Sequence, residues 1–360
     1  MFLEFESRIE AIIKFGYGLR NVFEVLSGLC ESNKLSPAEY RLYRAGLEAP
    51  LHNQWFTVKN VCEAIGALGD MLREEQLATW VEAYPELKHD VHKESKTIAV
   101  IQAGNIPLVG FHDFVCVLMA GHRFLGKLSS QDQILPVAAA GLLIEINSEF
   151  GNMIEFSGEP IRGFDGVVAT GSNNSARYFE YYFGKYPHII RKNRNSAAVI
   201  TGRDTSAELT LLGSDVFTFF GLGCRNVSKL LVPVGFNPEV FREAWAEWKH
   251  VADHHKYFNN YDYFKAVYLI NKQPFCDIDF CLLRREKPLG SPVSVVHYEE
   301  YSSESWLRDY LENEKDNLQC IIGNISLPNH SIIPFGTSQR PSLWDYADRI
   351  DTMKFLLADI

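Results

Sequence analysis

The chain has 360 residues, 46% of them hydrophobic and 22% charged, which is the composition of an ordinary globular protein of about two domains. Its formal net charge of −10 argues against nonspecific binding to nucleic acid and against attraction to an anionic membrane surface. No apolar run reaches membrane-spanning length, and acids follow Met1 where a signal peptide carries basic residues, so no membrane insertion is expected.

Residues 1–95 carry apolar side chains at helical spacing, which predicts a helical N-terminal region. Ser36-Pro37 is a helix-start signal, since proline fits the first turn of a helix. The expected helices are Ile9–Cys30, Pro37–Ala49, Thr57–Leu68 and Arg73–Tyr84.

From Thr97 the pattern changes to strands alternating with helices, which predicts a parallel sheet and an α/β fold. The expected strands are Thr97–Gln102, Arg123–Leu128 and Gly166–Ala169, and the expected helices are Phe111–Ala120, Val137–Phe150 and Ser175–Phe183. Turns at 103–105, 127–130 and 170–172 follow these strands. Because such sheets bind ligands at the carboxyl ends of their strands, we expect the turns to share one cleft.

Cys224 lies in a Gly-x-Gly-Cys turn between a helix expected from Ser206 to Phe220 and a buried strand, Val227–Val234. Two glycines let the backbone approach a bound group, and Arg225 favours a thiolate. A buried structural cysteine is the alternative interpretation of this turn. The chain has seven cysteines, an odd number without a CxxC pair, which indicates free thiols and a cytoplasmic location.

A second series of helices and strands follows Cys224, and we place the domain break near Ile200, where the first series ends. The expected elements of this series and of the tail are a helix at Pro238–His250, a strand at Val293–Tyr298, helices at Ser305–Lys315 and Trp344–Leu357, and a strand at Cys320–Gly323.

Six short motifs occur in the order in which the aldehyde dehydrogenase superfamily carries them. They are Asn105-Ile106-Pro107, Lys127-Leu128-Ser129-Ser130, Gly171-Ser172, Gly221-Leu222-Gly223-Cys224, Leu289-Gly290-Ser291-Pro292-Val293 and Pro334-Phe335-Gly336. None is specific alone, but six in order over residues 97–340 resemble that superfamily strongly. The resemblance implies two parallel-sheet α/β domains, a cofactor-binding domain of residues 1–199 with the tail 337–360, and a catalytic cysteine domain of residues 200–336.

The segments GNIPLV and LGKLSSQD look most like the acyl-CoA reductase branch, the family of the luciferase-associated fatty acyl-CoA reductase. This likeness implies NAD(P)H-dependent reduction of an acyl-CoA thioester to an aldehyde. Cys224 is then the nucleophile, and Asn105 stabilises the oxyanion together with the backbone N–H of Cys224. A turn asparagine without a catalytic role is the alternative for Asn105.

The resemblance also implies which residues hold the cofactor, NADPH or NADH. They are Lys127, Ser129, Ser130, Gly171 and Ser172. Ser130 stands where the family carries a ribose-binding acid, so we expect NADPH to be accepted at least as well as NADH. A solvated lysine at 127 and an ordinary helix cap at 171–172 are the alternatives.

Arg191 falls where the hydrolytic members of the superfamily carry a glutamate, so the resemblance disfavours release of a carboxylic acid. With Lys192 and Arg194 it forms a cationic cluster that we expect to attract the phosphates of CoA. Asp204 or a histidine remains open as another base. A hydrolytic aldehyde dehydrogenase and a non-catalytic scaffold, suggested by Leu222 and Ala176, are the alternative functions.

His250, His254 and His255 form an HxxxHH motif on an expected helix, but neither acid nor cysteine completes a metal site, so we interpret them as surface histidines. The expected small-molecule partner is acyl-CoA. A homo-oligomer and a protein that delivers acyl groups are left open.

Overall fold

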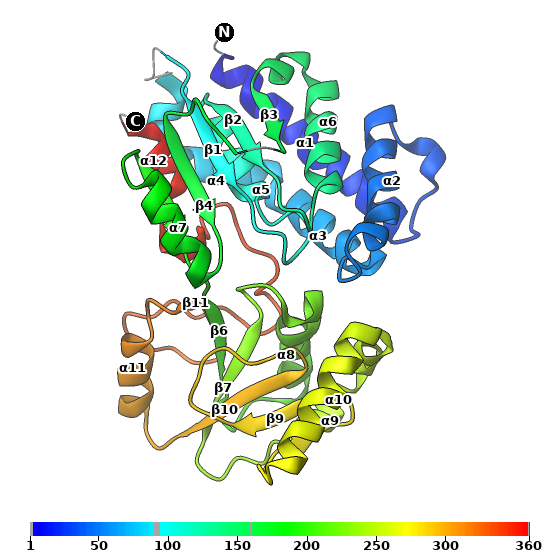
Figure 1. Ribbon diagram of the computed structural model, residues 1–360, viewed down its shortest axis with the longest axis vertical. Coiled ribbons are helices and arrows are strands. Elements are labelled where there is room, and N and C mark those ends of the chain that lie inside the picture. The colour runs from blue at the N-terminus through cyan, green and yellow to red at the C-terminus, as the bar shows by residue number, and fades with distance from the viewer. Residues whose placement is uncertain (1–2, 90–93, 159, 359) are drawn as a thin grey trace. The chain divides into compact units, whose positions relative to one another are not determined.

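The computed structural model describes residues 3–89, 94–158, 160–358 and 360, and the chain divides into two compact units (Figure 1). Unit 1 comprises Met1–Lys192 and Arg340–Ile360, and unit 2 comprises Asn193–Gln339. The break near Ile200 was placed too late, because the strand β6 (Asn195–Val199) hydrogen-bonds within the sheet of unit 2.

The N-terminal part of unit 1 is helical, as its apolar spacing predicts. Its helices are α1 (Phe5–Leu26), α2 (Pro37–His52), α3 (Val58–Met71) and α4 (Glu74–Glu82). Ser36 caps α2 by accepting a hydrogen bond from the N–H of Glu39 at 3.2 Å, while the Glu39 carboxylate accepts one from the Ser36 N–H at 2.7 Å. Ile12 and Phe15 of α1 are fully buried, and α1 packs against α3, α5 (Phe111–Met119) and α6 (Ile134–Ile146).

The sheet of unit 1 is parallel and has the strand order β3-β2-β1-β4-β5. Its strands are β1 (Thr97–Ile101), β2 (Arg123–Lys127), β3 (Ile154–Ser157), β4 (Gly166–Thr170) and β5 (His188–Arg191). Alternate residues face opposite sides: Ile98 and Val100 join the core with α5 and α6, whereas Ala99 packs with Phe179 of α7 (Asn173–Phe183). Both faces of the sheet are therefore buried, which explains why its strands read as continuous apolar runs.

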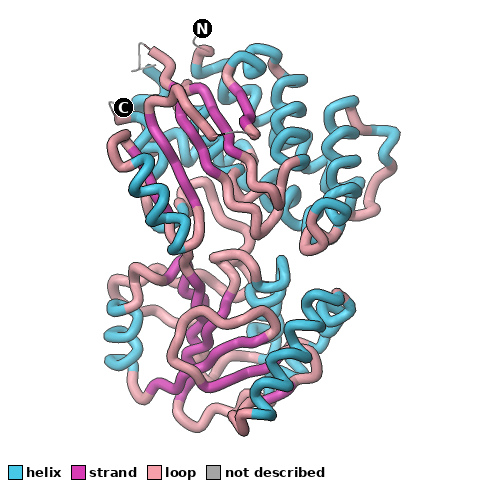
Figure 2. The backbone as a smooth tube through the Cα atoms, viewed as in Figure 1, coloured by secondary structure: helices cyan, strands magenta, loops and turns pink. Residues whose placement is uncertain are grey.

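Unit 2 is built on a mostly parallel sheet with the order β11-β6-β7-β10-β9-β8, in which only β8 pairs antiparallel. Strands are drawn in magenta in Figure 2. Its remaining elements are α8 (Ser206–Phe217), β7 (Val227–Pro233), α9 (Val240–Ala244), α10 (His255–Ile270), β8 (Cys276–Asp277), β9 (Leu282–Arg285), β10 (Val295–Tyr301), α11 (Glu304–Asn313) and β11 (Leu318–Gly323). Leu307 and Leu311 of α11 pack on Val199 and Leu231 of the sheet. The predicted fold class, two α/β units with parallel sheets and a helical N-terminal region, is confirmed.

Some expected helices are shorter than their periodicity predicts. The expected helix Pro238–His250 divides into α9 and a 3-10 helix, Ala246–Asp253. The expected helix Trp344–Leu357 is reduced to α12 (Thr352–Leu357), because Asp348 adopts a left-handed backbone with φ of 58° and interrupts the helical hydrogen bonding. Periodic apolar residues in these segments face a core without forming a continuous helix.

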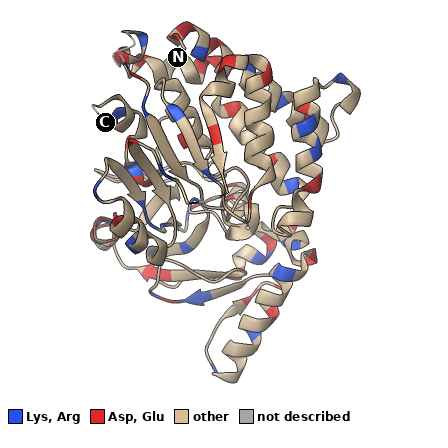
Figure 3. Cartoon of the chain, turned by 45° about the horizontal axis from the view of Figure 1, so that its top comes forward, with Lys and Arg blue, Asp and Glu red and all other residues tan. Residues whose placement is uncertain are grey.

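Acidic and basic residues are interspersed over the helices in Figure 3, while most of the strand ribbon is uncharged. No helix among the described residues has the length and apolar composition needed to cross a membrane.

Candidate functional site

The turns predicted to bind the cofactor lie at one edge of the sheet of unit 1. β2, β1 and β4 are neighbours in this parallel sheet, so the turns after Lys127, Ile101 and Thr170 emerge at the same carboxyl edge. Two of these turns touch closely: a Cβ added at Gly104 would lie 2.7 Å from the Cβ of Ser129. The three turns therefore lie at one edge of the sheet, whereas the cleft that they were expected to share stays a prediction.

Lys127 and the two serines that follow it have different surroundings. The Nζ of Lys127 donates a hydrogen bond to the carbonyl of Gly158, in the turn after β3. Ser129 is half-buried, and its Oγ accepts a hydrogen bond from the N–H of Gln131 at 3.2 Å. Ser130 is exposed. Lys127 is therefore held at the sheet edge, and Ser130 is accessible to solvent.

Asp132 organises the turn that carries Asn105. Asn105 is exposed, and the turn ends at Leu108, whose backbone is left-handed with φ of 56°. The N–H of Leu108 donates to Oδ2 of Asp132 at 2.8 Å. Asp132 is only 5% exposed, and burial raises its pKa to about 6. Asp132 was not singled out from the sequence, although an acid two residues after the Lys127–Ser130 turn was a usable signal.

The turn at Gly171 and Ser172 begins α7. The Oγ of Ser172 accepts a hydrogen bond from the N–H of Ser175 at 3.2 Å and so caps the helix. A Cβ at Gly171 would lie 2.8 Å from Cε2 of Phe179 and 2.9 Å from Cβ of Ser175, so only glycine fits. The backbone therefore passes unusually close to the first turn of α7, whose N–H groups favour an anion.

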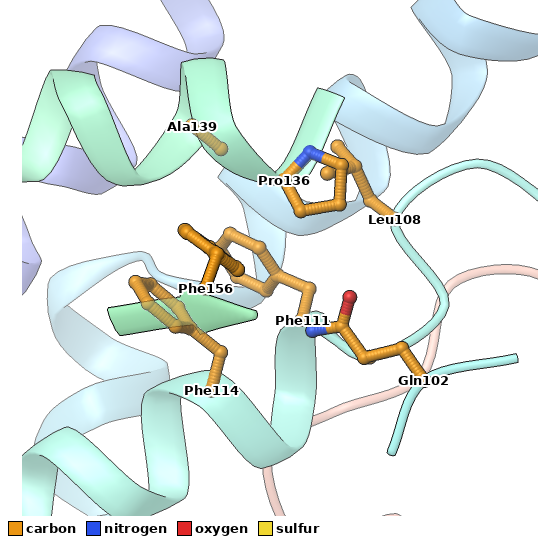
Figure 4. A pocket seen from close by; sticks show the side chains of 8 residues that line it. Gln102, Leu108, Phe111, Phe114, Pro136, Ala139 and Phe156 are labelled. Carbon is orange, nitrogen blue, oxygen red and sulfur yellow. The ribbon is translucent and has the colours of Figure 1, made fainter. Parts of the chain in front are cut away.

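A small apolar pocket in unit 1 lies between α5, α6 and β3 (Figure 4). It is lined by Gln102, Leu108, Gly110, Phe111, Phe114, Pro136, Ala139 and Phe156. The rings of Phe111 and Phe114 lie 6.2 Å apart, an ordinary core contact. Asn105 and the five predicted cofactor-binding residues are not among its lining residues.

In unit 2, α8 ends earlier than predicted and a strained turn leads to Cys224. The N-cap is Thr205, not Ser206, and the helix ends at Phe217. Phe219, Phe220 and Gly221 then follow with φ of 55°, 57° and 75°. A left-handed backbone costs about 1–2 kcal/mol for each non-glycine residue, so this turn must be held by its surroundings.

Asn226 holds that turn from the far side of Cys224. Its Oδ1 accepts a hydrogen bond from the N–H of Gly223 at 2.8 Å. Its Nδ2 donates to the carbonyls of Thr218, Asp215 and Val216 at 2.8, 3.1 and 3.4 Å. The Asn226 side chain is buried, and this hydrogen bonding admits only one orientation of its amide.

The peptide of Cys224 itself is fixed from β6. The Oγ of Ser196 donates to the carbonyl of Cys224 at 2.9 Å and accepts from the N–H of Cys320 at 3.1 Å. Ser196 is fully buried, whereas Cys224 is half-buried and carries a thiol that is not part of a disulfide. The carbonyl of Cys224 is thus tied to β6 of the unit 2 sheet.

Arg225 ties the cysteine turn to the turn at Pro334–Gly336. Its Nε donates to the carbonyl of Ser338 at 2.5 Å. Asp215 of α8 accepts hydrogen bonds from the N–H groups of Gly336 and Ser338 at 2.6 and 2.9 Å. Burial raises the pKa of Asp215, while these bonds and the nearby Arg225 oppose the rise. Arg225 thus has an anchoring contact that the expectation of thiolate stabilisation did not include.

Arg191 contradicts the expected cationic cluster. It lies in unit 1, where its guanidinium pairs with Asp113 of α5 through Nη1–Oδ2 at 2.6 Å and Nη2–Oδ1 at 2.9 Å. Nη2 also donates to Oγ1 of Thr352 at 2.6 Å. Only 3% of its side chain is exposed, so Arg191 is a structural residue and is not accessible to the phosphates of CoA.

The histidines of the HxxxHH motif do not share one helix. His250 lies in the 3-10 helix, and His254 precedes α10 with its ring 4.5 Å from that of Phe220. Among the residues that the structure describes, no group of three His, Cys, Asp or Glu side chains is placed to hold a metal ion.

Comparison with solved structures identifies the fold. Aldehyde dehydrogenase KauB from Pseudomonas aeruginosa matches with a TM-score of 0.59 and 14% identity over 90% of this chain and 73% of that one. The chain has the aldehyde dehydrogenase fold. Aldehyde dehydrogenase 21 from Physcomitrella patens, solved with the reaction product succinate, matches with a TM-score of 0.61 and 12% identity over 98% of this chain and 87% of that one.

A third aldehyde dehydrogenase structure contains a cofactor. A mutant of the P. syringae indole-3-acetaldehyde dehydrogenase AldA, in complex with NAD+ and IAA, matches with a TM-score of 0.57 and 12% identity, covering 90% of this chain and 77% of that one. No protein-family model and no curated protein matches the chain. At these identities the similarity establishes the fold, and the reaction has to be inferred from the residues of the site.

Proposed function

We propose that the protein reduces an acyl-CoA thioester to an aldehyde with NADPH or NADH, through a covalent acyl-cysteine at Cys224. The observation that carries the proposal is Cys224 itself, a half-buried thiol in a fixed turn between a helix and a strand of an aldehyde dehydrogenase fold. Buried cysteines such as Cys281 and Cys320 differ from it, because their side chains are shielded from solvent.

The first chemical step is attack by the Cys224 thiolate on the thioester carbonyl. A carbon–sulfur bond forms to Cys224, a tetrahedral oxyanion develops, and collapse expels CoA as its thiolate, leaving a new thioester on the enzyme. The side-chain amide of Asn105 and the backbone N–H of Cys224 are the proposed oxyanion donors, and losing one such donor costs about 3 kcal/mol.

The carboxyl edge of the unit 1 sheet fits a nicotinamide dinucleotide, which when bound supplies the hydride that reduction requires. A Cβ at Gly171 would meet Phe179 and Ser175, so glycine lets the backbone pass close to the start of α7, whose N–H groups favour an anion such as a pyrophosphate. Gly171 and Ser172 would hold the pyrophosphate, and Lys127, Ser129 and Ser130 the ribose. Ser130 is exposed and uncharged, so no carboxylate at this position repels a 2′-phosphate.

Reduction is favoured over hydrolysis because of Arg191. At the position of the hydrolytic glutamate, the chain carries a guanidinium that is buried against Asp113. A guanidinium cannot activate water, and a general base contributes about 10²–10⁴ in rate. Hydrolysis to an acid is the second candidate function, with Asp204 as its alternative base; the Oδ2 of Asp204 accepts hydrogen bonds from the N–H groups of Thr201 and Gly202.

The test is consumption of NADPH and NADH with a panel of acyl-CoA thioesters. Cys224→Ala is expected to abolish turnover and the acyl adduct seen by intact mass, whereas Cys276→Ala, which removes another half-buried thiol of unit 2, retains both. An acyl adduct on the Cys224→Ala protein, or turnover by it, contradicts covalent catalysis at this residue. Oxidised cofactor without aldehyde product contradicts the reductase assignment.

A further inference from the structure

The left-handed turn before Cys224 is built from residues that favour other conformations. Phe219 and Phe220 are bulky, and both have positive φ. The two residues are 5% and 8% exposed, so burial of the side chains accompanies the unfavourable backbone. Strain of this kind persists only where surrounding contacts impose it, and it concentrates at functional sites.

Two buried polar side chains supply those contacts. Asn226 bonds to the N–H of Gly223 and to carbonyls at the end of α8, so it joins the start and the end of the turn. The N–H of Asn226 also donates to the carbonyl of Gly223 at 3.0 Å, which closes the backbone around Cys224. Ser196 holds the carbonyl of Cys224 from a separate strand.

We propose that Asn226 and Ser196 are positioning residues, which hold the Cys224 turn in one conformation and thereby place its thiol for attack. This inference rests on the proposed function only in taking the Cys224 thiol to be a nucleophile. The hydrogen bonds that fix the turn join residues of unit 2 alone.

The residues differ in what they fix, which predicts different sizes of effect. Ser196→Ala removes one hydroxyl and releases the Cys224 carbonyl, so local opening is expected to increase about fivefold, the factor that one ordinary hydrogen bond contributes. Asn226→Asp keeps an acceptor for Gly223 but presents a carboxylate to three carbonyls. An increase of at least about tenfold is expected for that variant.

Matched controls exist in the same unit. Ser214→Ala removes a hydroxyl whose Oγ donates to the carbonyl of Leu211 at 2.8 Å within α8. Asn260→Asp removes an amide whose Nδ2 donates to the carbonyl of Lys256 at 2.8 Å within α10. Neither bond involves the Cys224 turn, so Ser214→Ala controls for the loss of a hydrogen bond and Asn260→Asp controls for the added charge.

The experiment combines three measurements on the full chain. Hydrogen exchange of the 218–226 segment reports local opening, and carbamidomethylation of Cys224 by iodoacetamide reports access to its thiol. Both rates are expected to rise in Ser196→Ala and Asn226→Asp and to remain unchanged in the controls. Steady-state kinetics with an acyl-CoA is expected to show kcat reduced about 10- to 100-fold with KM retained, because misplacement of a reacting group affects the chemical step.

Unchanged exchange and alkylation in the folded Ser196→Ala protein overturn the proposal, and that variant decides the matter if Asn226→Asp does not fold. Equal changes in the controls also overturn it, because they indicate general destabilisation. Faster alkylation with unchanged kcat shows that the turn does not position the thiol. If the wild type reduces no acyl thioester, the proposed function fails, and exchange and alkylation alone decide whether these residues hold the turn.

Discussion

The buried pair of Arg191 and Asp113 allows a quantitative prediction for Arg191→Met. Methionine fills a similar volume but removes two charged hydrogen bonds, of 2.6 and 2.9 Å, from a carboxylate that is only 7% exposed. The buried Asp113 carboxylate is then left without its charged partner, in a site that excludes water. Removing one member of such a pair destabilises a protein by about 3–5 kcal/mol.

Urea unfolding of unit 1 measures this loss. Native-state hydrogen exchange of α5 and β5 assigns it to the elements that carry the pair. Arg44→Met is the control, because the Arg44–Glu48 pair is 52% and 46% exposed and is screened by solvent, so little loss is expected. In Asp113→Leu/Arg191→Met no buried charge remains unpaired, so most of the stability is expected to return.

Two results refute this reasoning. A loss below about 1 kcal/mol for Arg191→Met shows that Asp113 does not depend on the guanidinium. A double variant no more stable than the single one shows that the loss comes from packing around Arg191, and not from an unpaired charge.

Three further predictions concern pH, cofactor and product. Burial raises the pKa of Asp132 from 3.8 to about 6, so the native state binds more protons there than the unfolded chain does. The free energy of unfolding is therefore expected to fall by about 3 kcal/mol as pH rises from about 4 to about 6. In urea unfolding, the stability of Asp132→Asn relative to the wild type is expected to increase over that window, and a constant difference contradicts the prediction. Ser130→Glu is expected to lower kcat/KM for NADPH relative to NADH about tenfold by charge repulsion, and an unchanged ratio refutes the assignment of the ribose site. With an aldehyde and NADP+, product analysis is expected to find little acid without CoA and an acyl-CoA thioester when CoA is added, and rapid acid formation without CoA favours the hydrolytic function.

Local patterns in the sequence were sufficient to predict which turns lie at the carboxyl edge of the unit 1 sheet. The strands β1, β2 and β4 are short apolar runs followed by turn residues, and their parallel order follows from the alternation with helices. Lys127 and Gly171 could therefore be assigned to one edge before any contact was known. β5 was missed because His188 and Arg191 interrupt its apolar pattern.

The conformation of the cysteine turn depends on contacts that sequence spacing does not reveal. The apolar spacing of Phe219 and Phe220 continues that of α8, and it predicted helix where the backbone is left-handed. The decisive partner is Asn226, which lies beyond the cysteine. Arg191 and Asp113 are 78 residues apart, so their pairing emerges only when α5 and β5 pack in the folded unit.

The return of residues 340–360 to unit 1 separates the order of synthesis from the order of folding. Unit 2 is a continuous segment and leaves the ribosome before Thr352, whose hydroxyl bonds to Arg191, and before Leu356, whose carbonyl contacts Nε2 of His122 at 2.9 Å. Unit 1 is therefore synthesised first and closes last. In a chain whose translation stops after unit 2 and before α12, unit 2 is complete in sequence. Unit 1 is still incomplete and exposes the surface that α12 covers.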